Sequence, residues 1–487
     1  MAESSEKPQE DSLQRSEEKQ RQKDLSEPRH FTLPRWRLGP NLIKLIVSVV
    51  AAVVTFLLTN TLPPPLPMAL VLLVLAAALW ITESIPLAAT SLLIALLQPL
   101  LGIQDFTSAL APFFNPVVVL LLGGFLLAIA VDKHDLDERI GEAILRRLGS
   151  KPRWIVLGLM FGTALLSMWI SNTAAAALMI TVALPVANRV EDSKGNLQKI
   201  MILAVAYSAT LGGFMTLIGS PPNALAAAFL AQQGLTTISF LGWSLYALPL
   251  ALIMIIVTWR LLFLRFRTDV KWIPTIQPTV KRSLTGMQKG TLVIFLLAVI
   301  LWLTEPFHPL SSAMVAVAVA VMLFLAGLLK NEDIKKVEWN TLLLFGGGLS
   351  LGVALEISGL ADVLTGGVVA LEPVVGYIGI VAILAIATLI FSMVASNTAS
   401  ASIFIPIAIG VALVIPGANP VVFAVLIAIS SSIDFMLPIG TPPNAIAYST
   451  GRVSMKDMVT TGFALNLLSV FVTLLLAYFV WPFIPIL

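Results

Sequence analysis

Long runs of hydrophobic residues dominate the pattern along this chain. Clear examples are Ile43–Leu62, Pro67–Ile81 continuing to Leu101, Val117–Val131 and Leu292–Leu303. A helix that crosses the hydrocarbon core of a bilayer needs about 20 such residues. The runs are apolar on every side rather than striped, which indicates helices surrounded by lipid or by other apolar helices. The predicted fold class is therefore an all-α polytopic membrane protein.

Composition narrows the class of protein further. Hydrophobic residues make up 57% of the 487 residues and charged residues only 12%, against about 25% charged residues in soluble domains. The expected surroundings are therefore a lipid bilayer. The net charge of +3 is too small to indicate a nucleic-acid partner. The chain has no cysteine, which excludes disulfides, iron–sulfur clusters and thiol catalysis.

Residues 1–36 contrast with the rest of the chain, because they are rich in Glu, Gln, Lys, Ser and Arg. Such a segment cannot bury enough apolar area to order itself, so it is predicted to be a disordered tail. With this tail in the cytoplasm, about 11 spans and two re-entrant hairpins place every later cluster of Lys and Arg on the cytoplasmic side. The C-terminus is then outside, and the expected location is the plasma (inner) membrane.

Four short motifs recur in the same order at an offset of 221 to 225 residues. Chance does not produce four matches at one offset, so they indicate an internal repeat. An odd number of spans per copy inverts the second copy, which is typical of secondary transporters whose site lies where the copies meet. The paired motifs are Trp80–Glu83 with Trp302–Glu305, Asn115 and Gly123-Gly124 with Asn340 and Gly347-Gly348, Ser171–Thr173 with Ser396–Thr398, and Gly219–Asn223 with Gly440–Asn444.

The repeat divides the chain into predicted parts. Residues 41–153 and 154–265 are the two predicted parts of the first copy, and residues 290–375 and 376–487 are those of the second. Residues 266–289 form a cytoplasmic linker between the copies. Glu83 and Glu305 are interpreted as interface anchors or packing partners at span ends.

The two Ser-Asn-Thr triplets lie in the middle of apolar segments, where polar residues are costly. Each segment is long enough for two half-membrane helices joined by a turn at mid-depth. The second helix of such a hairpin exposes backbone amides that attract anions, and the Ser, Thr and Asn side chains add neutral donors. A single triplet could simply bond neighbouring helices, but the duplication favours a binding site.

The two Pro-Pro motifs are predicted to break helices, since consecutive prolines remove amide donors. The freed carbonyls near Gly219 and Gly440 can then bind a hard cation. No Lys or Arg lies in either hairpin or beside either break, so bound cations are the simplest means of neutralising an anion at mid-membrane. Asp434, six residues before Gly440, is a candidate for coupling or only for a hydrogen bond; the sequence leaves both open.

At these motifs, residues 40–487 resemble the divalent anion/sodium symporter family. The resemblance implies a homodimer in which a transport domain moves like an elevator against a scaffold, and sodium ions as co-transported cargo. It assigns residues 41–153 and 290–375 to the scaffold and residues 154–265 and 376–487 to the transport domain. It implies substrate contacts from Ser171, Asn172, Thr173, Ser220, Ser396, Asn397, Thr398, Thr441 and Pro442. One sodium site would use Ser167, Ser171, Asn172 and Gly219, and a second would use Ser392, Ala395, Asn397 and Gly440.

The expected function is sodium-coupled symport of C4 dicarboxylates such as succinate, fumarate and malate. Alternatives are a sodium-coupled sulfate or tricarboxylate carrier, because the motifs bind anionic oxygens without fixing their spacing, and a dicarboxylate exchanger. A channel is disfavoured because no span carries a polar stripe. An enzyme is disfavoured because the three histidines, His30, His134 and His308, lie outside the span centres.

Overall fold

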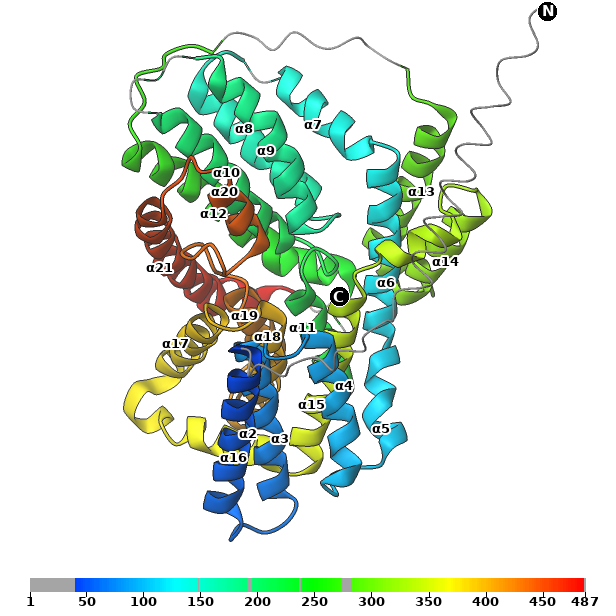
Figure 1. The fold of residues 1–487 in the computed structure, drawn as a ribbon, viewed down its shortest axis with the longest axis vertical. Helices are drawn as coiled ribbons and strands as arrows, with labels where there is room; N and C mark the ends of the chain where they lie inside the picture. Colours follow the sequence, from blue (N-terminus) through cyan, green and yellow to red (C-terminus); the bar gives the residue numbers. More distant parts are fainter. Residues whose placement is uncertain are drawn as a thin grey trace, which may run out of the picture. The chain divides into compact units, whose positions relative to one another are not determined.

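The protein is described here from a computed structural model that covers residues 40–147, 149–190, 192, 195–235, 238–273 and 283–485. In these ranges every regular element is a helix (Figure 1), as the apolar pattern predicts. The chain divides into two units, residues 1–43 and 44–487, and the contacts and the site discussed below belong to the second. The predicted tail lies outside the described residues, and so do residues 274–282 of the predicted linker.

The helices that carry the repeated motifs follow one another in the same order in the two halves. The first half contains α2 (Pro40–Thr59), α3 (Leu66–Thr82), α4 (Leu87–Leu100), α5 (Phe106–Leu110), α6 (Pro116–Lys133), α7 (Leu136–Arg147), α8 (Pro152–Ser167), α9 (Asn172–Asn188), α10 (Asn196–Gly213), α11 (Pro221–Gln232) and α12 (Phe240–Arg265). The second half contains α13 (Gly286–Leu303), α14 (Ser312–Leu325), α15 (Trp339–Ile357), α16 (Leu360–Val369), α17 (Glu372–Ser392), α18 (Asn397–Val414), α19 (Pro420–Ser430), α20 (Pro442–Ser449) and α21 (Met455–Phe479). Short 3₁₀ turns η1 (Ala111–Phe114), η2 (Glu305–Phe307), η3 (Asn331–Lys336) and η4 (Trp481–Phe483) lie between or after them.

Eight helical segments within the described residues are long and apolar enough to cross a bilayer. Seven apolar helices are shorter, among them α8 and α9, which have 16 and 17 residues. At 1.5 Å per residue each of these two is about 25 Å long, which is more than half of a hydrocarbon core about 30 Å thick. The first hairpin is therefore built from longer helices than the half-membrane helices expected, and the count of about 11 spans stays a prediction.

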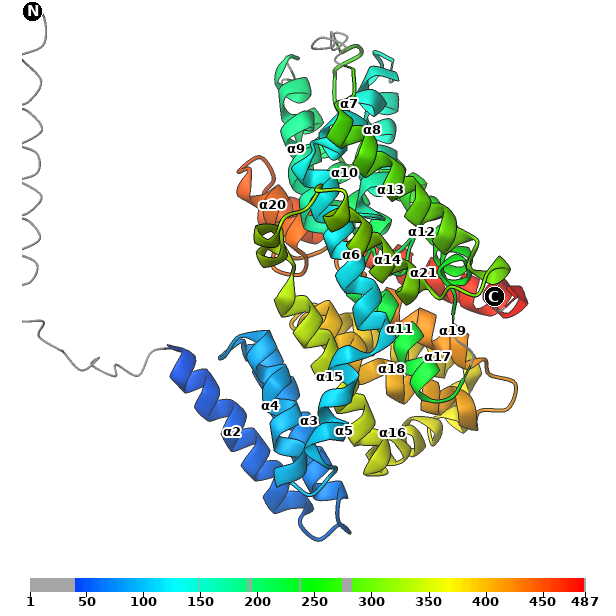
Figure 2. The same cartoon turned by 90° about the vertical axis from the view of Figure 1, so that its right-hand side faces the viewer.

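The short helices that follow the two Pro-Pro motifs each pack against the opposite repeat. Helix α11 lies against α18 and α19 of the second repeat, and α20 lies against α9 and α10 of the first (Figures 1 and 2). Each repeat thus supplies one helix to the other's bundle. This exchange brings both Pro-Pro motifs and both Ser-Asn-Thr triplets into one region.

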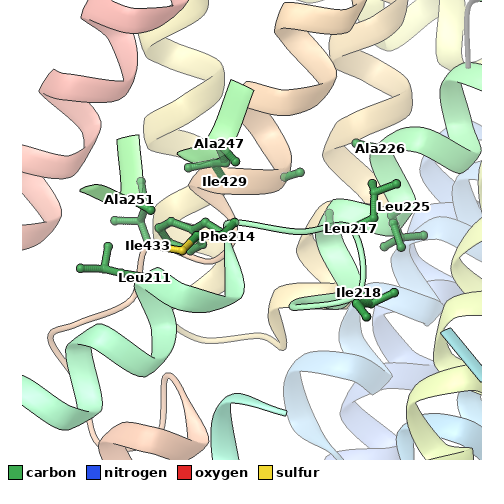
Figure 3. Close-up of a cluster of buried hydrophobic side chains, with 14 of the residues drawn as sticks. Leu211, Phe214, Leu217, Ile218, Leu225, Ala226, Ala247, Ala251, Ile429 and Ile433 are labelled. Atoms are coloured by element: carbon green, nitrogen blue, oxygen red, sulfur yellow. The ribbon is translucent and has the colours of Figure 1, made fainter. Parts of the chain in front are cut away.

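A buried apolar cluster holds the break between α10 and α11 in place (Figure 3). Phe214, the first residue after α10, is 1% exposed and lies among side chains of α12 and of the second repeat, including Ala251 and Ile433. Its backbone carbonyl accepts a hydrogen bond from the Trp243 indole N–H at 2.9 Å. The helix therefore ends inside the protein core, and the backbone groups at the break remain among buried side chains.

The repeated Gly-Gly pairs allow helices to approach closely. A Cβ atom on Gly123 of α6 would lie 2.6 Å from Ala316 of α14, and one on Gly347 of α15 would lie 2.3 Å from the Cβ atom of Ser91 of α4. Small residues at such crossings allow the backbones of membrane helices to pack against each other. This repeated motif serves helix packing in both halves and contributes no donor to the site.

Contacts within the described residues join the loops that carry the basic clusters. The Lys133 ammonium pairs with the Asp333 carboxylate at 2.5 Å, and Lys199 pairs with Asp457 at 2.9 Å. The backbone N–H of Ile273 donates to the carbonyl of Ser150 at 2.8 Å. Segments that the sequence places on one side of the membrane are thus in mutual contact, although which side they face stays a prediction.

Candidate functional site

The first Ser-Asn-Thr triplet forms the start of α9, directly after the turn that ends α8. Ser171 has an extended backbone (φ −61°, ψ 143°), and its hydroxyl accepts a hydrogen bond from the backbone N–H of Ala174 at 3.3 Å. It is therefore the N-cap of the helix, a position that favours Ser because the first helical N–H groups lack partners. The remaining free N–H groups of this turn carry the positive end of the helix dipole.

The second triplet has the same geometry at the start of α18. Ser396 has φ −68° and ψ 146°, and its hydroxyl accepts from the backbone N–H of Ala399 at 3.1 Å. The two helix N-termini are therefore equivalent anion-binding elements supplied by different repeats. The placement of both triplets at helix starts matches the sequence interpretation.

An oxygen-rich cluster lies behind the first triplet. The Ser167 hydroxyl donates toward both the Asn172 side-chain oxygen and the carbonyl of Ala209, each at 2.6 Å. A hydroxyl has only one proton, so it cannot satisfy both acceptors at once. Three oxygen atoms so close together form an environment that suits a hard cation such as sodium.

The second repeat contains the matching cluster. The Ser392 hydroxyl donates to the Asn397 side-chain oxygen at 2.8 Å, and the carbonyl of Ser431 is a second acceptor for it. Ser167 and Ser392 are both buried. The structure therefore brings each of these serines together with the triplet asparagine of its own repeat, as the two predicted cation sites require.

The asparagine of each Pro-Pro-Asn motif has a structural role that the sequence interpretation missed. The Asn223 side-chain amide donates to the carbonyls of Gly213 and Thr216, both at 2.7 Å. It therefore bridges the end of α10 and the break, and it satisfies carbonyls that the interrupted helix leaves free. The sequence interpretation included Asn223 in the motif. It could not identify the carbonyls that the amide contacts, because they lie seven to ten residues earlier and form no recognisable motif with Asn223.

The same bridge occurs in the second repeat. The Asn444 side-chain amide donates to the carbonyls of Asp434 and Leu437, both at 3.0 Å. The side-chain oxygens of Asn223 and Asn444 are buried and have no hydrogen-bond partner. Each break is therefore held by an asparagine whose second polar atom remains unsatisfied.

A cavity of about 660 Å³ unites the repeated motifs. Ser220 lines this cavity, while Thr441 instead caps α20 by accepting from the backbone N–H of Asn444 at 3.4 Å. Ser167, Ser392 and Asp434 lie outside its lining. The predicted site residues that line it are Ser171, Asn172, Thr173, Gly219, Ser220, Ala395, Ser396, Asn397, Thr398, Gly440 and Pro442.

Three charged residues also line the cavity, and the sequence interpretation assigned none of them to a site. Lys44 of α2 lies on the wall together with Glu83 and Glu338. Lys44 belongs to neither the hairpins nor the Pro-Pro breaks, so a basic residue reaches the cavity wall from a segment where the sequence interpretation did not expect one. Lys44 is exposed, so the rest of the protein covers little of its side chain.

The two repeated Thr-Glu pairs differ in their surroundings. The Glu305 carboxylate accepts hydrogen bonds from the backbone N–H groups of Phe240 and Ser312 at 3.0 and 2.9 Å, as a packing partner would. Glu83 lines the cavity, and its backbone is left-handed (φ 48°), which is unusual for a residue other than glycine. The anchor interpretation therefore describes Glu305 well but misses the position of Glu83.

Comparison with known proteins gives a consistent assignment. Residues 40–487 match the family model described as the sodium:sulfate symporter transmembrane region. The chain is 33% identical over 439 residues to the sodium-dependent dicarboxylate transporter SdcS of Staphylococcus saprophyticus, which covers 83% of this chain and 84% of that protein. It is also 33% identical over 441 residues to SdcS of Staphylococcus aureus, covering 84% of each.

Two solved structures are similar in fold. The YdaH transporter of Alcanivorax borkumensis matches with a TM-score of 0.53 at 17% identity and covers 78% of this chain and 89% of that one. MtrF of Neisseria gonorrhoeae matches with a TM-score of 0.52 at 14% identity and covers 88% of this chain and 96% of that one. At such low identity the likeness extends to the helical arrangement alone.

Proposed function

The chain belongs to the divalent anion/sodium symporter family and is thus a membrane transporter and not an enzyme, and on this premise we propose that it carries C4 dicarboxylates together with sodium. One observation carries the proposal. Both Ser-Asn-Thr triplets and both Pro-Pro motifs line a single cavity, although more than 200 residues separate the copies in the chain. The relatives named as sodium-dependent dicarboxylate transporters support the choice of substrate.

The anion is held by the two helix N-termini in this proposal. A dicarboxylate has two negative groups at a fixed separation, and the N-termini of α9 and α18 offer two sets of donors on the same cavity. The side chains of Thr173, Ser220 and Thr398 add neutral donors from the cavity wall. Neutral donors and helix dipoles bind an anion without holding it as strongly as a buried cationic side chain, which suits a cargo that must be released.

The sodium ions bind behind the substrate in this proposal. Both triplet asparagines line the cavity. The side-chain oxygen of Asn172 contacts Ser167, and that of Asn397 contacts Ser392. A cation that draws these oxygens together also fixes the helix start that receives a carboxylate. Substrate and sodium therefore stabilise the same arrangement, which couples their binding.

Movement and orientation are part of the same proposal. We take α8–α12 and α17–α21 as the transport part that moves like an elevator, against a scaffold that includes α4, α6, α14 and α15, in a homodimer. The packing of α11 and α20 into the opposite repeats supports one moving body. The inverted repeat, re-entrant hairpins, cytoplasmic N-terminus and outside C-terminus can be tested by labelling. Since the chain has no cysteine, single cysteines can be placed at Ser150 and at the exposed Asp362. In intact cells an impermeant thiol reagent should label the cysteine at position 362, whereas the one at position 150 should react only after the cells are opened.

Uptake into proteoliposomes tests the transport function. We expect labelled succinate to accumulate when sodium is outside and to remain at background level when choline replaces sodium. Sulfate in place of succinate tests the alternative that the family description suggests. Uptake of succinate that needs internal dicarboxylate but no sodium would instead establish exchange.

A further inference from the structure

Asp434 is a buried carboxylate that the transport scheme above does not use. It is 0% exposed, and neither of its side-chain oxygens has a hydrogen-bond partner. The backbone N–H groups of Met436 and Leu437 interact favourably with the carboxylate, although neither meets hydrogen-bond geometry with it. Among the described residues, no Lys or Arg makes an ion pair with it. A charged carboxylate that is buried with so little compensation is very costly, so Asp434 must take up either a proton or a bound cation.

The carboxylate lies directly against a predicted sodium ligand. A Cβ atom added to Gly440 would lie 1.8 Å from one Asp434 oxygen and 2.5 Å from the other. The carboxylate therefore fills the space beside Gly440 that any other residue's side chain would occupy. Since Gly440 also lines the cavity, only one backbone unit separates the carboxylate from the site.

The first repeat shows what this position borders. The residue that corresponds to Asp434 is Gly213, 221 residues earlier. A Cβ atom on Gly213 would lie 2.5 Å from the side-chain oxygen of Asn172, which belongs to the first cation cluster. A side chain at this position of a repeat is therefore directed at the triplet asparagine and the cation cluster around it. The first repeat leaves the position empty, and the second fills it with a negative charge.

Groups on the neighbouring helices do not neutralise this charge. Tyr207 of α10 is the titratable side chain that faces Asp434, and its ring packs edge-on against Phe435 at 5.4 Å. Its hydroxyl is buried without a partner. From α21, Asp457 is already paired with Lys199, and the Asn466 side-chain oxygen accepts from the backbone N–H of Phe435 at 3.0 Å. The open direction is toward Gly440.

We propose that Asp434 is a charged element of the second sodium site, so that the second repeat binds its cation with a carboxylate where the first repeat uses neutral oxygens alone. This inference rests on the proposed sodium coupling and adds to it an asymmetry between the two sites. The second site then binds sodium before substrate arrives, since its negative charge is already present. The first site depends more on the arriving dianion for its charge balance.

Thermal unfolding of the purified full-length protein without substrate tests this assignment. Wild type and Asp434→Asn are titrated with sodium chloride against choline chloride at constant ionic strength. The variant should need about tenfold or more sodium for the same stabilisation, as expected when a cation loses a charged neighbour. In choline alone it should unfold at the same or a higher temperature than wild type, because it no longer buries an uncompensated charge. A purely structural role would lower the unfolding temperature in both salts.

Two further variants control the experiment. Asp137→Asn removes another buried carboxylate, on α7 and outside the cavity lining, and should leave the sodium midpoint unchanged. Asp434→Gly reproduces the first repeat's residue and should show the same loss as Asp434→Asn, which keeps the test decisive if the Asn variant does not fold. An unchanged sodium midpoint in both Asp434 variants, beside a normal wild-type response, overturns this assignment alone. A wild type that does not respond to sodium overturns the sodium coupling and this assignment together.

Discussion

The two repeats build the same hairpin and the same helix break, yet they differ at positions beside the two oxygen clusters. In each copy a Ser caps the second helix of the hairpin, and an Asn accepts from a buried Ser five residues earlier. In each copy the Asn after the prolines bridges two carbonyls at the break. These shared contacts define the minimum that both repeats need to present a helix N-terminus and a cluster of oxygens.

The differences lie at the positions of Gly213 and Thr216 in the first repeat, which are Asp434 and Leu437 in the second. The Thr216 hydroxyl donates to the carbonyl of Met168 at 2.6 Å and accepts from the backbone N–H of Gly219 at 3.1 Å. It therefore ties the break to the hairpin by neutral hydrogen bonds. Leu437 cannot form these bonds, and the second repeat has a carboxylate nearby instead. The comparison supports the proposal of one neutral site, held by these hydrogen bonds, and one charged site.

The largest effects should come from the contacts that both repeats share. Asn172→Ala and Asn397→Ala each remove an oxygen of the cation cluster and a polar group on the cavity wall. Two lost interactions of about 1.5 kcal/mol each predict a loss of roughly 100-fold or more in uptake. Proteoliposome uptake and gel filtration measure function and folding separately. Full activity in one variant and none in the other would show that the repeats do not contribute equally to the site.

The paired serines should show the difference between the two cation sites. Ser167→Ala removes one of few neutral oxygens, whereas Ser392→Ala leaves the Asp434 charge in place. We expect the sodium concentration for half-maximal uptake to rise about tenfold in the first variant and about threefold in the second. Substrate affinity at saturating sodium should change less in both. Equal shifts would argue against a charged second site.

Thr216→Val tests the neutral tie of the first repeat. The valine keeps the shape of the side chain but leaves the partly buried carbonyl of Met168 without its donor. The free energy of unfolding should fall by about 1–3 kcal/mol, with a parallel loss of activity at raised temperature. Thermal unfolding measures the change, and Leu437→Val is the matched control because that position makes no hydrogen bond through its side chain. A loss as large in the control would assign the effect to packing.

How much of this the sequence could predict depends on the kind of contact. The repeated triplets and Pro-Pro motifs were predictable because helix starts and breaks are set by local chemistry at Ser171, Ser396 and the paired prolines. The bridges from Asn223 and Asn444 and the position of Lys44 on the cavity wall were not, because they depend on which distant segments the fold brings together. The exchange of α11 and α20 between repeats belongs to the same class. Asp434 was visible as an anomaly, but only its contact with Gly440 gives it a role.

The smallest predicted effect lies outside the site, where Lys133 and Asp333 join two loops. Burial alone would raise the pKa of Asp333, but hydrogen bonds from Lys133 and from the backbone of Lys330 lower it overall. A lowered pKa in the folded state gives stability that is present above the unfolded pKa and is lost as the pH falls through the folded value, below about pH 4. Asp333→Asn should lower the unfolding temperature at neutral pH by only about 1 °C and abolish this part of the acid dependence. Melting curves from pH 3 to 7 give both values.

In the proposed mechanism, two cation sites, one from each repeat, and one dianion share a single arrangement. Succinate binding to the purified protein, measured over a range of sodium concentrations, tests this coupling. Succinate affinity should rise steeply with sodium, with a Hill coefficient above one in wild type and near one in Ser167→Ala. Succinate affinity in choline equal to that in sodium would contradict the coupling.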